Sequence, residues 1–153
     1  MGRRLVLLAG LAVVVLPSPA VAASPPKVIR VTAVTTLIRR HDVAPKGKPS
    51  PGDTILDRDR VLNAAPQFGK PAGAVVGSDT GTFTYGANAV TFVGSVTLPG
   101  GKLIIKGPVQ FRSTTSYVLP VTAGTGAFKG AHGTLTVSGG SAKRALNVYR
   151  LSY

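Results

Sequence analysis

Residues 90–112 read VTFVGSVTLPGGKLIIKGPVQFR, and this stretch decides the fold class. Apolar side chains recur at every second position on both sides of Pro99-Gly100-Gly101, as in two strands joined by a tight turn. The alternating residues are Val90, Phe92, Val96 and Leu98 before the turn, and Leu103, Ile105, Val109 and Phe111 after it. The sequence therefore predicts an antiparallel hairpin with one apolar face on each strand.

The same two-residue period continues outside this hairpin, whereas helical spacing of apolar residues is nearly absent. Gly and Pro divide the chain into eight predicted strands: 27–40, 53–63, 72–85, 88–98, 102–112, 115–122, 134–138 and 144–153. Strands of this number and length, joined mostly by short turns, predict an all-β fold. We expect an eight-stranded antiparallel up-and-down β-barrel, because closure removes exposed strand edges. An open β-sandwich is the alternative.

The N-terminal residues have the three parts of a secretory signal peptide. Arg3 and Arg4 precede the apolar run LVLLAGLAVVVL at 5–16, and small residues follow at 20–23. The apolar run has 12 residues, whereas a membrane-spanning helix needs roughly 20. We therefore expect residues 1–23 to be a signal peptide that is cleaved near Ala22-Ala23, and the mature protein to be secreted or otherwise extracytoplasmic.

The remaining part, 24–153, has the length of one domain and contains neither Cys nor Glu. The absence of Cys excludes a thiolate metal site, a cysteine nucleophile and a disulfide-stabilised core. Without Arg3 and Arg4 the formal net charge of +13 falls to +11. This charge favours an anionic wall polymer or lipid surface as a possible partner. The basic residues are scattered and no RNA-binding aromatic motif accompanies them, so no nucleic-acid partner is expected.

The most distinctive segment of the chain is TAGTGAFKGAHG at 122–133. It resembles the Gly-Gly-x-Gly-x-Phe-x-Gly-Ala-x-Gly run of allene oxide cyclases and plant dirigent proteins, although Ala123 stands where that superfamily commonly has Gly. Further matches occur in the same order at Gly52-Asp53, at 69–73 and at Gly107-Pro108. The resemblance covers about 31–153, and it implies an eight-stranded barrel with an apolar cavity, usually assembled as a homotrimer.

The glycines of this segment predict a structural role. Their spacing, Gly-x-Gly-x-x-x-Gly before a strand, matches neither a dinucleotide-binding loop nor a P-loop. We expect them to turn the chain across one barrel end, with Phe128 folded inward as a plug. His41 and His132 are isolated in the sequence, so neither a metal site nor a cofactor is predicted.

Asp57 and Asp59 are the candidate catalytic residues. Strand parity places both on one face with Ile55 and Val61. Two carboxylates beside aliphatic side chains repel each other and could hold one proton at neutral pH, as a general acid or base does. The alternative is that each pairs with an Arg or Lys of a neighbouring strand near the barrel mouth. Dirigent-like proteins carry a functional Asp in a comparable region, so the resemblance implies the same two positions.

Five further residues are candidates for ligand binding. Tyr85, Phe92, Phe111 and Tyr117 could stack on a flat or unsaturated ligand, although core packing is the alternative for each. Asn63 stands near the position where the resemblance implies an Asn that binds water. Allene oxide cyclases also rely on a Glu, which this chain lacks, so that reaction itself is not expected.

Two functions follow from these patterns. The first is a dirigent-like or cyclase-like barrel that binds a small apolar intermediate and directs its stereoselective cyclisation or coupling without a cofactor, as an isomerase would. The second is a non-catalytic exported barrel that binds a lipid, a secondary metabolite or the cell envelope through its basic surface. Several strands are apolar on both faces, which predicts a homo-oligomer, either a trimer or a dimer.

Overall fold

The computed structural model describes residues 26–43, 45–139 and 143–153, and the predicted signal peptide lies outside these ranges. The described residues form antiparallel strands and no helix. The strands are β1 (Val28–His41), β2 (Thr54–Asn63), β3 (Val75–Tyr85), β4 (Val90–Leu98), β5 (Gly101–Pro108), β6 (Gln110–Ser113), β7 (Ser116–Gly126), β8 (His132–Gly139) and β9 (Arg144–Ser152). A search of the same ranges for a helix long and apolar enough to cross a membrane finds none.

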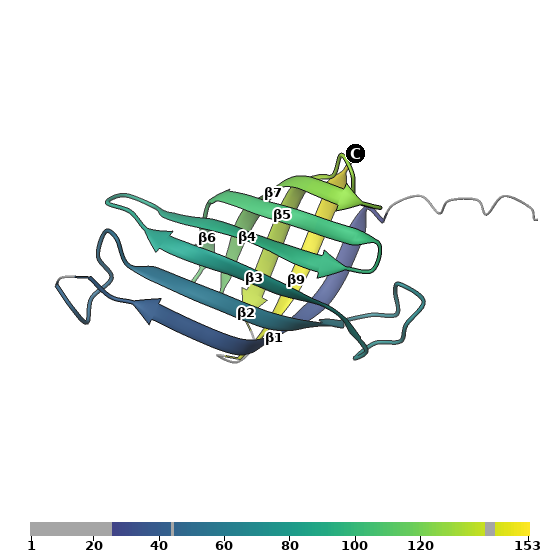
Figure 1. The fold of residues 1–153 in the computed structure, drawn as a ribbon, viewed down its shortest axis with the longest axis horizontal. Helices are drawn as coiled ribbons and strands as arrows, with labels where there is room; N and C mark the ends of the chain where they lie inside the picture. Colours follow the sequence, from purple (N-terminus) through teal and green to yellow (C-terminus); the bar gives the residue numbers. More distant parts are fainter. Residues whose placement is uncertain (1–25, 44, 140–142) are drawn as a thin grey trace, which may run out of the picture.

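The strands form one sheet that closes on itself (Figure 1). Neighbours pair in the order β5-β4-β3-β2-β1-β9-β8-β7-β6, and an additional pairing of β5 with β7 closes the ring. The strands β5 and β6 are two parts of one interrupted strand, because both pair with β7 and only Val109 separates them. The predicted eight-stranded up-and-down barrel is therefore confirmed, and the open sandwich is wrong.

The interruption between β5 and β6 has a local cause. Gly107 has a φ of +152°, and a Cβ at this position would lie 2.5 Å from Cγ of Pro120 on β7. Pro108, which follows, has no N–H to donate to the sheet. The Gly107-Pro108 pair thus ends β5 within the predicted strand 102–112.

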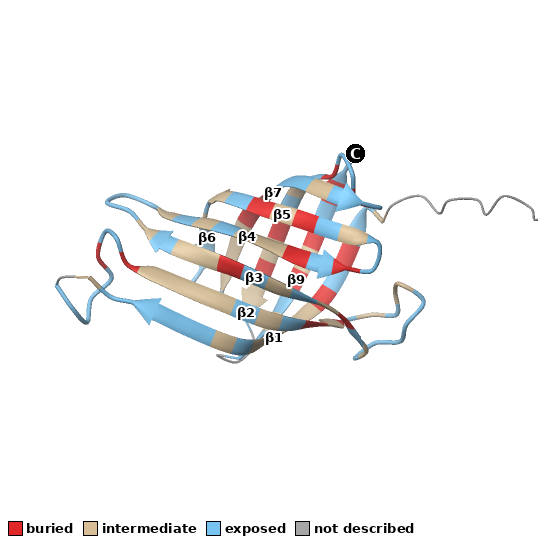
Figure 2. Cartoon of the chain, viewed as in Figure 1, coloured by how far each residue is buried: buried red, intermediate tan, exposed pale blue. Residues whose placement is uncertain are grey.

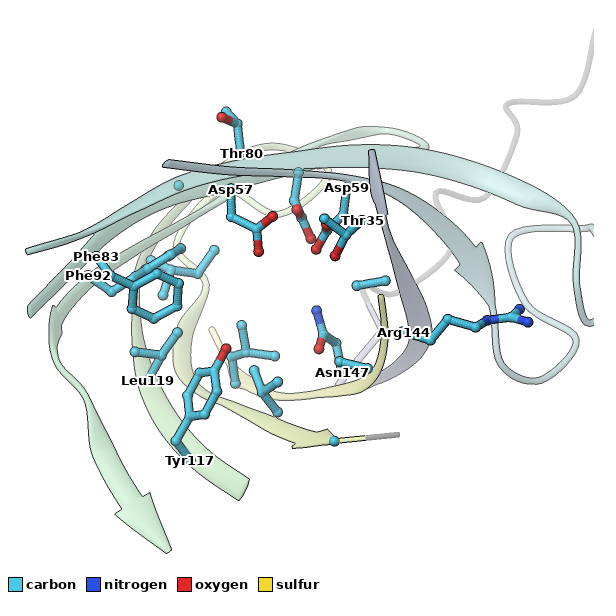
Figure 3. Close-up of a pocket in the computed structure, with 18 of the residues that line it drawn as sticks. Thr35, Asp57, Asp59, Thr80, Phe83, Phe92, Tyr117, Leu119, Arg144 and Asn147 are labelled. Carbon is cyan, nitrogen blue, oxygen red and sulfur yellow. The ribbon is translucent and has the colours of Figure 1, made fainter. Parts of the chain in front are cut away.

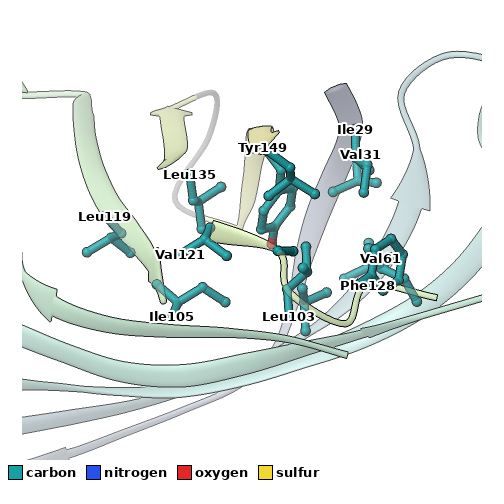
Figure 4. Packing of buried hydrophobic residues seen from close by; sticks show 14 of the residues in the cluster. Ile29, Val31, Val61, Leu103, Ile105, Leu119, Val121, Phe128, Leu135 and Tyr149 are labelled. Atoms are coloured by element: carbon teal, nitrogen blue, oxygen red, sulfur yellow. The ribbon is translucent and has the colours of Figure 1, made fainter. Parts of the chain in front are cut away.

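One half of the barrel is filled by the hydrophobic core. The core contains Ile29, Val31, Val61, Val96, Leu103, Phe128, Tyr149 and Leu151, among others, from every side of the barrel (Figure 4). Most buried positions lie towards the end that carries the loop 64–74 (Figure 2). Phe128, in the turn between β7 and β8, is 1% exposed and packs in this cluster. This confirms the predicted plug, so we name this half the closed end.

The glycine-rich segment differs from its prediction in one respect. The strand β7 continues to Gly126 instead of ending at residue 122, because Gly124 and Gly126 still pair with Leu103 and Gly101 of β5. A Cβ at Gly124 would overlap the backbone carbonyl of Phe128. The first glycines of the segment therefore allow the turn to fold back closely over the barrel end.

Candidate functional site

The other half of the barrel, which we name the open end, contains a cavity of about 430 Å³. This volume falls within the range of small-molecule pockets. Residues of β1 to β9 line it, and besides aliphatic and hydroxyl side chains they include a wall of carboxyl groups, a wall of aromatic rings and polar residues on β9. The site is built from inward-facing positions on the strands, which hold side chains more rigidly than loops do.

The acidic wall consists of Asp57 and Asp59 on β2 and Asp79 on β3. Asp59 and Asp79 are direct cross-strand partners, and Asp57 precedes Asp59 by two residues on the same face. Figure 3 shows Asp57 and Asp59 pointing into the cavity. Arg58, which lies between them in the sequence, is exposed on the outer face. The two-residue period of a strand thus places three carboxyl groups in one small area.

Burial is the largest influence on the pKa values of Asp57 and Asp79. Burial, followed by the charge of Asp59, raises the pKa of Asp57 to about 6. Burial, followed by the charges of Asp59 and Asp57, raises the pKa of Asp79 to about 8. No basic side chain is among the causes of either shift, and Arg58 acts on the pKa of Asp57 only through a backbone hydrogen bond, which lowers it. Burial first and repulsion between the carboxyl groups second, and not ion pairing with a neighbouring strand, therefore determine the pKa values of Asp57 and Asp79.

The aromatic wall consists of Phe83, Phe92, Phe111 and Tyr117. The rings of Phe83 and Phe92 have centroids 4.7 Å apart, and Phe83 meets Tyr117 edge to face at 6.0 Å. Phe111 lies 6.1 Å from Tyr117 and is 65% exposed, at the rim of the cavity. Rings at these separations attract one another, and they present one apolar surface to the cavity.

A pair of glycines allows Phe92 to occupy its place in this wall. Gly81 on β3 and Gly94 on β4 are direct cross-strand partners. A Cβ at Gly81 would overlap the Phe92 ring, and a Cβ at Gly94 would lie 2.6 Å from its Cζ atom. The ring therefore lies over backbone that carries no side chain, which leaves the cavity open.

The third part of the site is Asn147 and Tyr149 on β9. Asn147 is 5% exposed, and its Oδ1 atom has no hydrogen-bond partner among the described residues. Figure 3 shows its side chain pointing into the cavity from the side facing Asp57 and Asp59. Burial raises the pKa of Tyr149, and burial together with the carboxyl charges raises the pKa of Tyr117 to about 12. Both phenols are therefore neutral at physiological pH and can donate a hydrogen bond.

The structure brings together five of the residues that the sequence suggested for the site, namely Asp57, Asp59, Phe92, Phe111 and Tyr117. Asn63 and Tyr85 do not line the cavity. Asn63 shares the inward parity of Asp59 but lies beyond Val61, at the closed end, where the core fills the barrel. Its Nδ2 atom contacts the carbonyl oxygens of Gln67 and Lys70 at 2.8 and 3.0 Å and so holds the loop 64–74. Tyr85 is the last residue of β3, past the inward-facing Phe83.

Sequence reasoning missed Asp79, Phe83, Asn147 and Tyr149. The alternation of β9 does place Asn147 on the face of Tyr149, but the depth at which the core ends is not visible in the sequence. Asp79 has the same parity as Gly81 and Phe83 on β3. Its position opposite Asp59 depends on the register of β2 with β3, which shifts between Val61 and Leu62.

Within 26–43, 45–139 and 143–153, no group of three or more His, Cys, Asp or Glu residues is arranged to hold a metal ion. The two histidines lie at different ends of the barrel. His41 ends β1 at the open end, and His132 begins β8 at the closed end.

The fold and the cavity together define a class of protein: a small, closed antiparallel β-barrel with a ligand-sized cavity at one end. Solved structures similar to it include the following two. One is a pyocyanin demethylase, with a TM-score of 0.66 and 19% identity, covering 82% of this chain and 99% of that one. The other is a pterocarpan synthase dirigent protein, with a TM-score of 0.60 and 16% identity, covering 81% of each chain.

No family model matches the chain, and no curated protein matches it in sequence. The two structural likenesses show the fold. They confirm the resemblance to the dirigent and allene oxide cyclase barrels at that level.

Proposed function

We propose that this protein is a dirigent-like or cyclase-like barrel that binds a small, largely apolar intermediate in its cavity and directs the stereoselective cyclisation or coupling of that compound. The activity would be of the isomerase or cyclase type and would need no cofactor. One observation carries the proposal: Asp57, Asp59 and Asp79 share one wall of a cavity that also has a wall of aromatic rings. The names of the two similar structures describe a demethylase of pyocyanin and a synthase of pterocarpan, which are both small molecules.

The carboxyl groups supply the acid–base chemistry in this proposal. At pH 7 the carboxyl of Asp79, with a pKa of about 8, holds its proton, whereas that of Asp57, with a pKa of about 6, is mostly ionised. One group can donate a proton to a bound intermediate while the other accepts one. Carboxyl groups whose environments separate their pKa values in this way are suited to opposite roles.

The aromatic wall supplies orientation. A flat compound held between Phe83, Phe92 and Tyr117 on one side and the carboxyl groups on the other has few ways to lie. Restriction to a reactive conformation lowers the entropic part of the barrier and also selects one face for ring closure. Stereoselectivity follows from the shape of the cavity in this proposal.

The test starts from a fractionated metabolite extract of the source cells. Native mass spectrometry identifies the fraction that the purified protein retains, and chiral chromatography then follows that compound during incubation with protein. We expect the unaltered protein to retain one compound and to enrich one stereoisomer of its product, and Asp59→Asn to lose that enrichment. The matched control is Arg60→Gln, which changes an exposed residue on the outer face next to Asp59. Equal product composition with the unaltered protein, Asp59→Asn and no protein would overturn the proposal.

A second candidate function, binding to the cell envelope, is favoured by a groove on the outside of the barrel. The groove is lined by two cationic residues, two acidic residues and five hydroxyl-bearing residues, namely Arg58 and Lys102, Asp59 and Asp79, and Thr36, Ser78, Thr80, Ser95 and Thr97. Two cations beside hydroxyl donors suit phosphate or carboxylate groups of an anionic wall polymer or lipid surface. Co-sedimentation with anionic and neutral vesicles tests this function. Salt-sensitive binding to the anionic vesicles would support it if the double variant Arg58→Gln/Lys102→Gln loses that binding. Equal sedimentation with anionic and with neutral vesicles would exclude it.

We further propose that the mature chain, which starts near Ala22-Ala23, acts outside the cytoplasm as a homo-oligomer. The support for assembly is the set of large apolar side chains on the outside of the barrel, which includes Val93 and Leu146. N-terminal sequencing of the exported protein tests the cleavage, and light scattering after size-exclusion chromatography distinguishes a trimer, a dimer and a monomer.

A further inference from the structure

The cavity contains more buried hydrogen-bond acceptors than the described residues satisfy. The Oδ1 atoms of Asp57, Asp59 and Asn147 are all buried without a partner. A buried acceptor that stays unpaired costs about 1–3 kcal/mol. These atoms belong to residues on facing sides of the cavity, so a molecule between them would satisfy several at once by presenting hydrogen-bond donors.

The described residues that line the cavity include three carboxyl groups and one cation. Its titratable residues are Asp57 and Asp59 from β2, Asp79 from β3, Tyr117 from β7, and Arg144 and Tyr149 from β9. The two phenols are neutral, and Figure 3 shows the guanidinium of Arg144 extending away from the cavity. A ligand between these walls therefore faces carboxyl groups, and Arg144 is the one cation among the described lining residues, so an anionic ligand is repelled and a cationic one is attracted.

The aromatic wall adds a requirement of shape. Phe83, Phe92 and Tyr117 form a continuous apolar surface against which a planar ring can stack. Aromatic faces also attract a positive charge that has been removed from water. The acidic and aromatic walls thus favour the same kind of molecule.

We propose that the ligand of this cavity is a flat aromatic cation that carries at least one N–H donor, such as a protonated amino-substituted nitrogen heterocycle. This inference rests on the proposed function in placing the ligand in the cavity, and it names the class of substrate. The N–H group donates to the unpaired oxygens of Asp57, Asp59 or Asn147, while the ring stacks on the aromatic wall. Deep burial of Asn147, which is 5% exposed, makes its unpaired oxygen a marker of the binding position.

Binding of such a cation should release a proton. The carboxyl of Asp79 is protonated at neutral pH, because its pKa is about 8 in the empty cavity. A positive charge beside it stabilises the ionised form, so the proton leaves to the buffer as the ligand enters. Affinity for the cation should consequently rise with pH up to about pH 8.

The experiment uses three fluorescent probes with the same ring framework and different charge. They are 9-aminoacridine, which is a cation with N–H donors at neutral pH, acridine, which is neutral there, and acridine-9-carboxylate. Fluorescence titration of the purified protein measures each affinity, and calorimetry in buffers of different ionisation enthalpy counts the released protons. We expect 9-aminoacridine to bind at least tenfold more tightly than acridine, acridine-9-carboxylate to bind least, and 9-aminoacridine to release a proton.

The variants locate the effect in the cavity. Asp59→Asn should weaken 9-aminoacridine at least tenfold and change acridine little, whereas Arg60→Gln should leave all three affinities unchanged. The net charge of the chain is +13, so its surface as a whole repels a cationic probe. Non-specific binding to the surface therefore cannot produce tighter binding of 9-aminoacridine.

The outcomes separate this inference from the proposed function. Three outcomes would overturn the inference: comparable affinity for the three probes, tighter binding of acridine or its carboxylate, or no binding of any probe. This comparison uses the unaltered protein and does not depend on the folding of a variant. If the cation binds with the expected selectivity but the retained metabolite is not converted, the class of ligand stands and the catalytic proposal fails.

Discussion

Asp59 of β2 lies directly opposite Asp79 of β3 in the antiparallel ladder, and both residues line the same cavity. Side chains in such positions have Cβ atoms about 4.5–5.5 Å apart, and like charges there destabilise a sheet. Three inward positions on two adjacent strands are occupied by Asp, where an apolar residue would pack more favourably. The free energy of unfolding therefore depends on whether these carboxyl groups hold a proton.

The stability of the protein should therefore fall as pH rises from about 4 to about 8. The folded pKa of Asp79, about 8, lies above its ordinary value of 3.8, so the native state binds more protons than the unfolded state between these values. The contribution of the protonated Asp79 to the free energy of unfolding is complete below the ordinary pKa of 3.8. It is lost as the pH rises through the folded pKa of about 8. One proton corresponds to a slope of at most about 1.4 kcal/mol per pH unit in the free energy of unfolding. Denaturant unfolding at several pH values measures the slope.

Asp79→Asn should flatten most of this pH dependence, because the amide stays neutral throughout the range. The control is Asp42→Asn, which changes an exposed loop carboxylate that accepts a hydrogen bond from the N–H of Gly47 at 3.0 Å. The slope should be unchanged in the control. A slope that survives in Asp79→Asn would show that other groups cause it.

Asp59→Asn should lower the pKa values of both Asp57 and Asp79. After burial, the charge of Asp59 is the largest cause of the upward shift at each of these residues. Burial persists in the variant, so the pKa of Asp79 should remain above its ordinary value. Carbon-13 NMR of the side-chain carboxyl carbons follows both titrations. Unchanged midpoints for both residues would mean that the three groups titrate independently.

Much of the fold could be predicted from the sequence, because a barrel strand needs only a two-residue period and a turn at each end. The stretch 90–112 contains both, and the structure has β4, the turn and a fifth strand in the predicted places, although the fifth strand is divided into β5 and β6. Phe128 could be predicted as a plug because a single large apolar residue stands among turn-forming glycines. Parity likewise places Asp57 and Asp59 on one face without knowledge of any partner strand.

The rest of the site depends on the register between strands and on the extent of the core. Strand parity predicts neither of them. Asp79 meets Asp59 only in one register of β2 with β3, and a bulge near Val61 sets that register. Asn63 and Asp59 have the same parity, but the core ends between them, so Asp59 faces a cavity and Asn63 faces a loop. Which inward positions face a cavity is determined by how far the core fills the barrel from its closed end.

Gly81→Ala should reduce ligand binding by moving the Phe92 ring. A Cβ at Gly81 would overlap that ring, and the backbone beneath it cannot retreat because Gly81 is paired with Gly94. The ring must turn into the cavity and take up space there. Titration with 9-aminoacridine should show at least a tenfold loss of affinity in Gly81→Ala.

The matched experiment adds a second substitution, Phe92→Leu, which makes room for the new Cβ atom at position 81. In Gly81→Ala/Phe92→Leu the smaller side chain no longer meets the new Cβ, so part of the lost affinity should return despite the loss of an aromatic ring. Phe92→Leu alone measures the cost of losing that ring. If the double variant binds no better than Gly81→Ala, the substitution acts through the backbone of β3 and not through Phe92.

Asn63→Ala should destabilise the protein and leave the cavity intact. The Nδ2 atom of Asn63 donates to the carbonyl oxygens of Gln67 and Lys70, and the residue is 2% exposed. These carbonyl groups keep their backbone donors, the N–H groups of Lys70 and Gln67, so the substitution costs the lost side-chain hydrogen bonds, about 0.5–1.5 kcal/mol each. Urea unfolding measures the loss, while the affinity for 9-aminoacridine should be unchanged because Asn63 lies at the closed end. Tyr85→Phe, at the rim of the open end, is the control. It should change the free energy of unfolding much less than Asn63→Ala does, and it should leave the affinity for 9-aminoacridine unchanged. Weakened probe binding in an Asn63→Ala protein that is as stable as the unaltered one would instead place Asn63 in the ligand site.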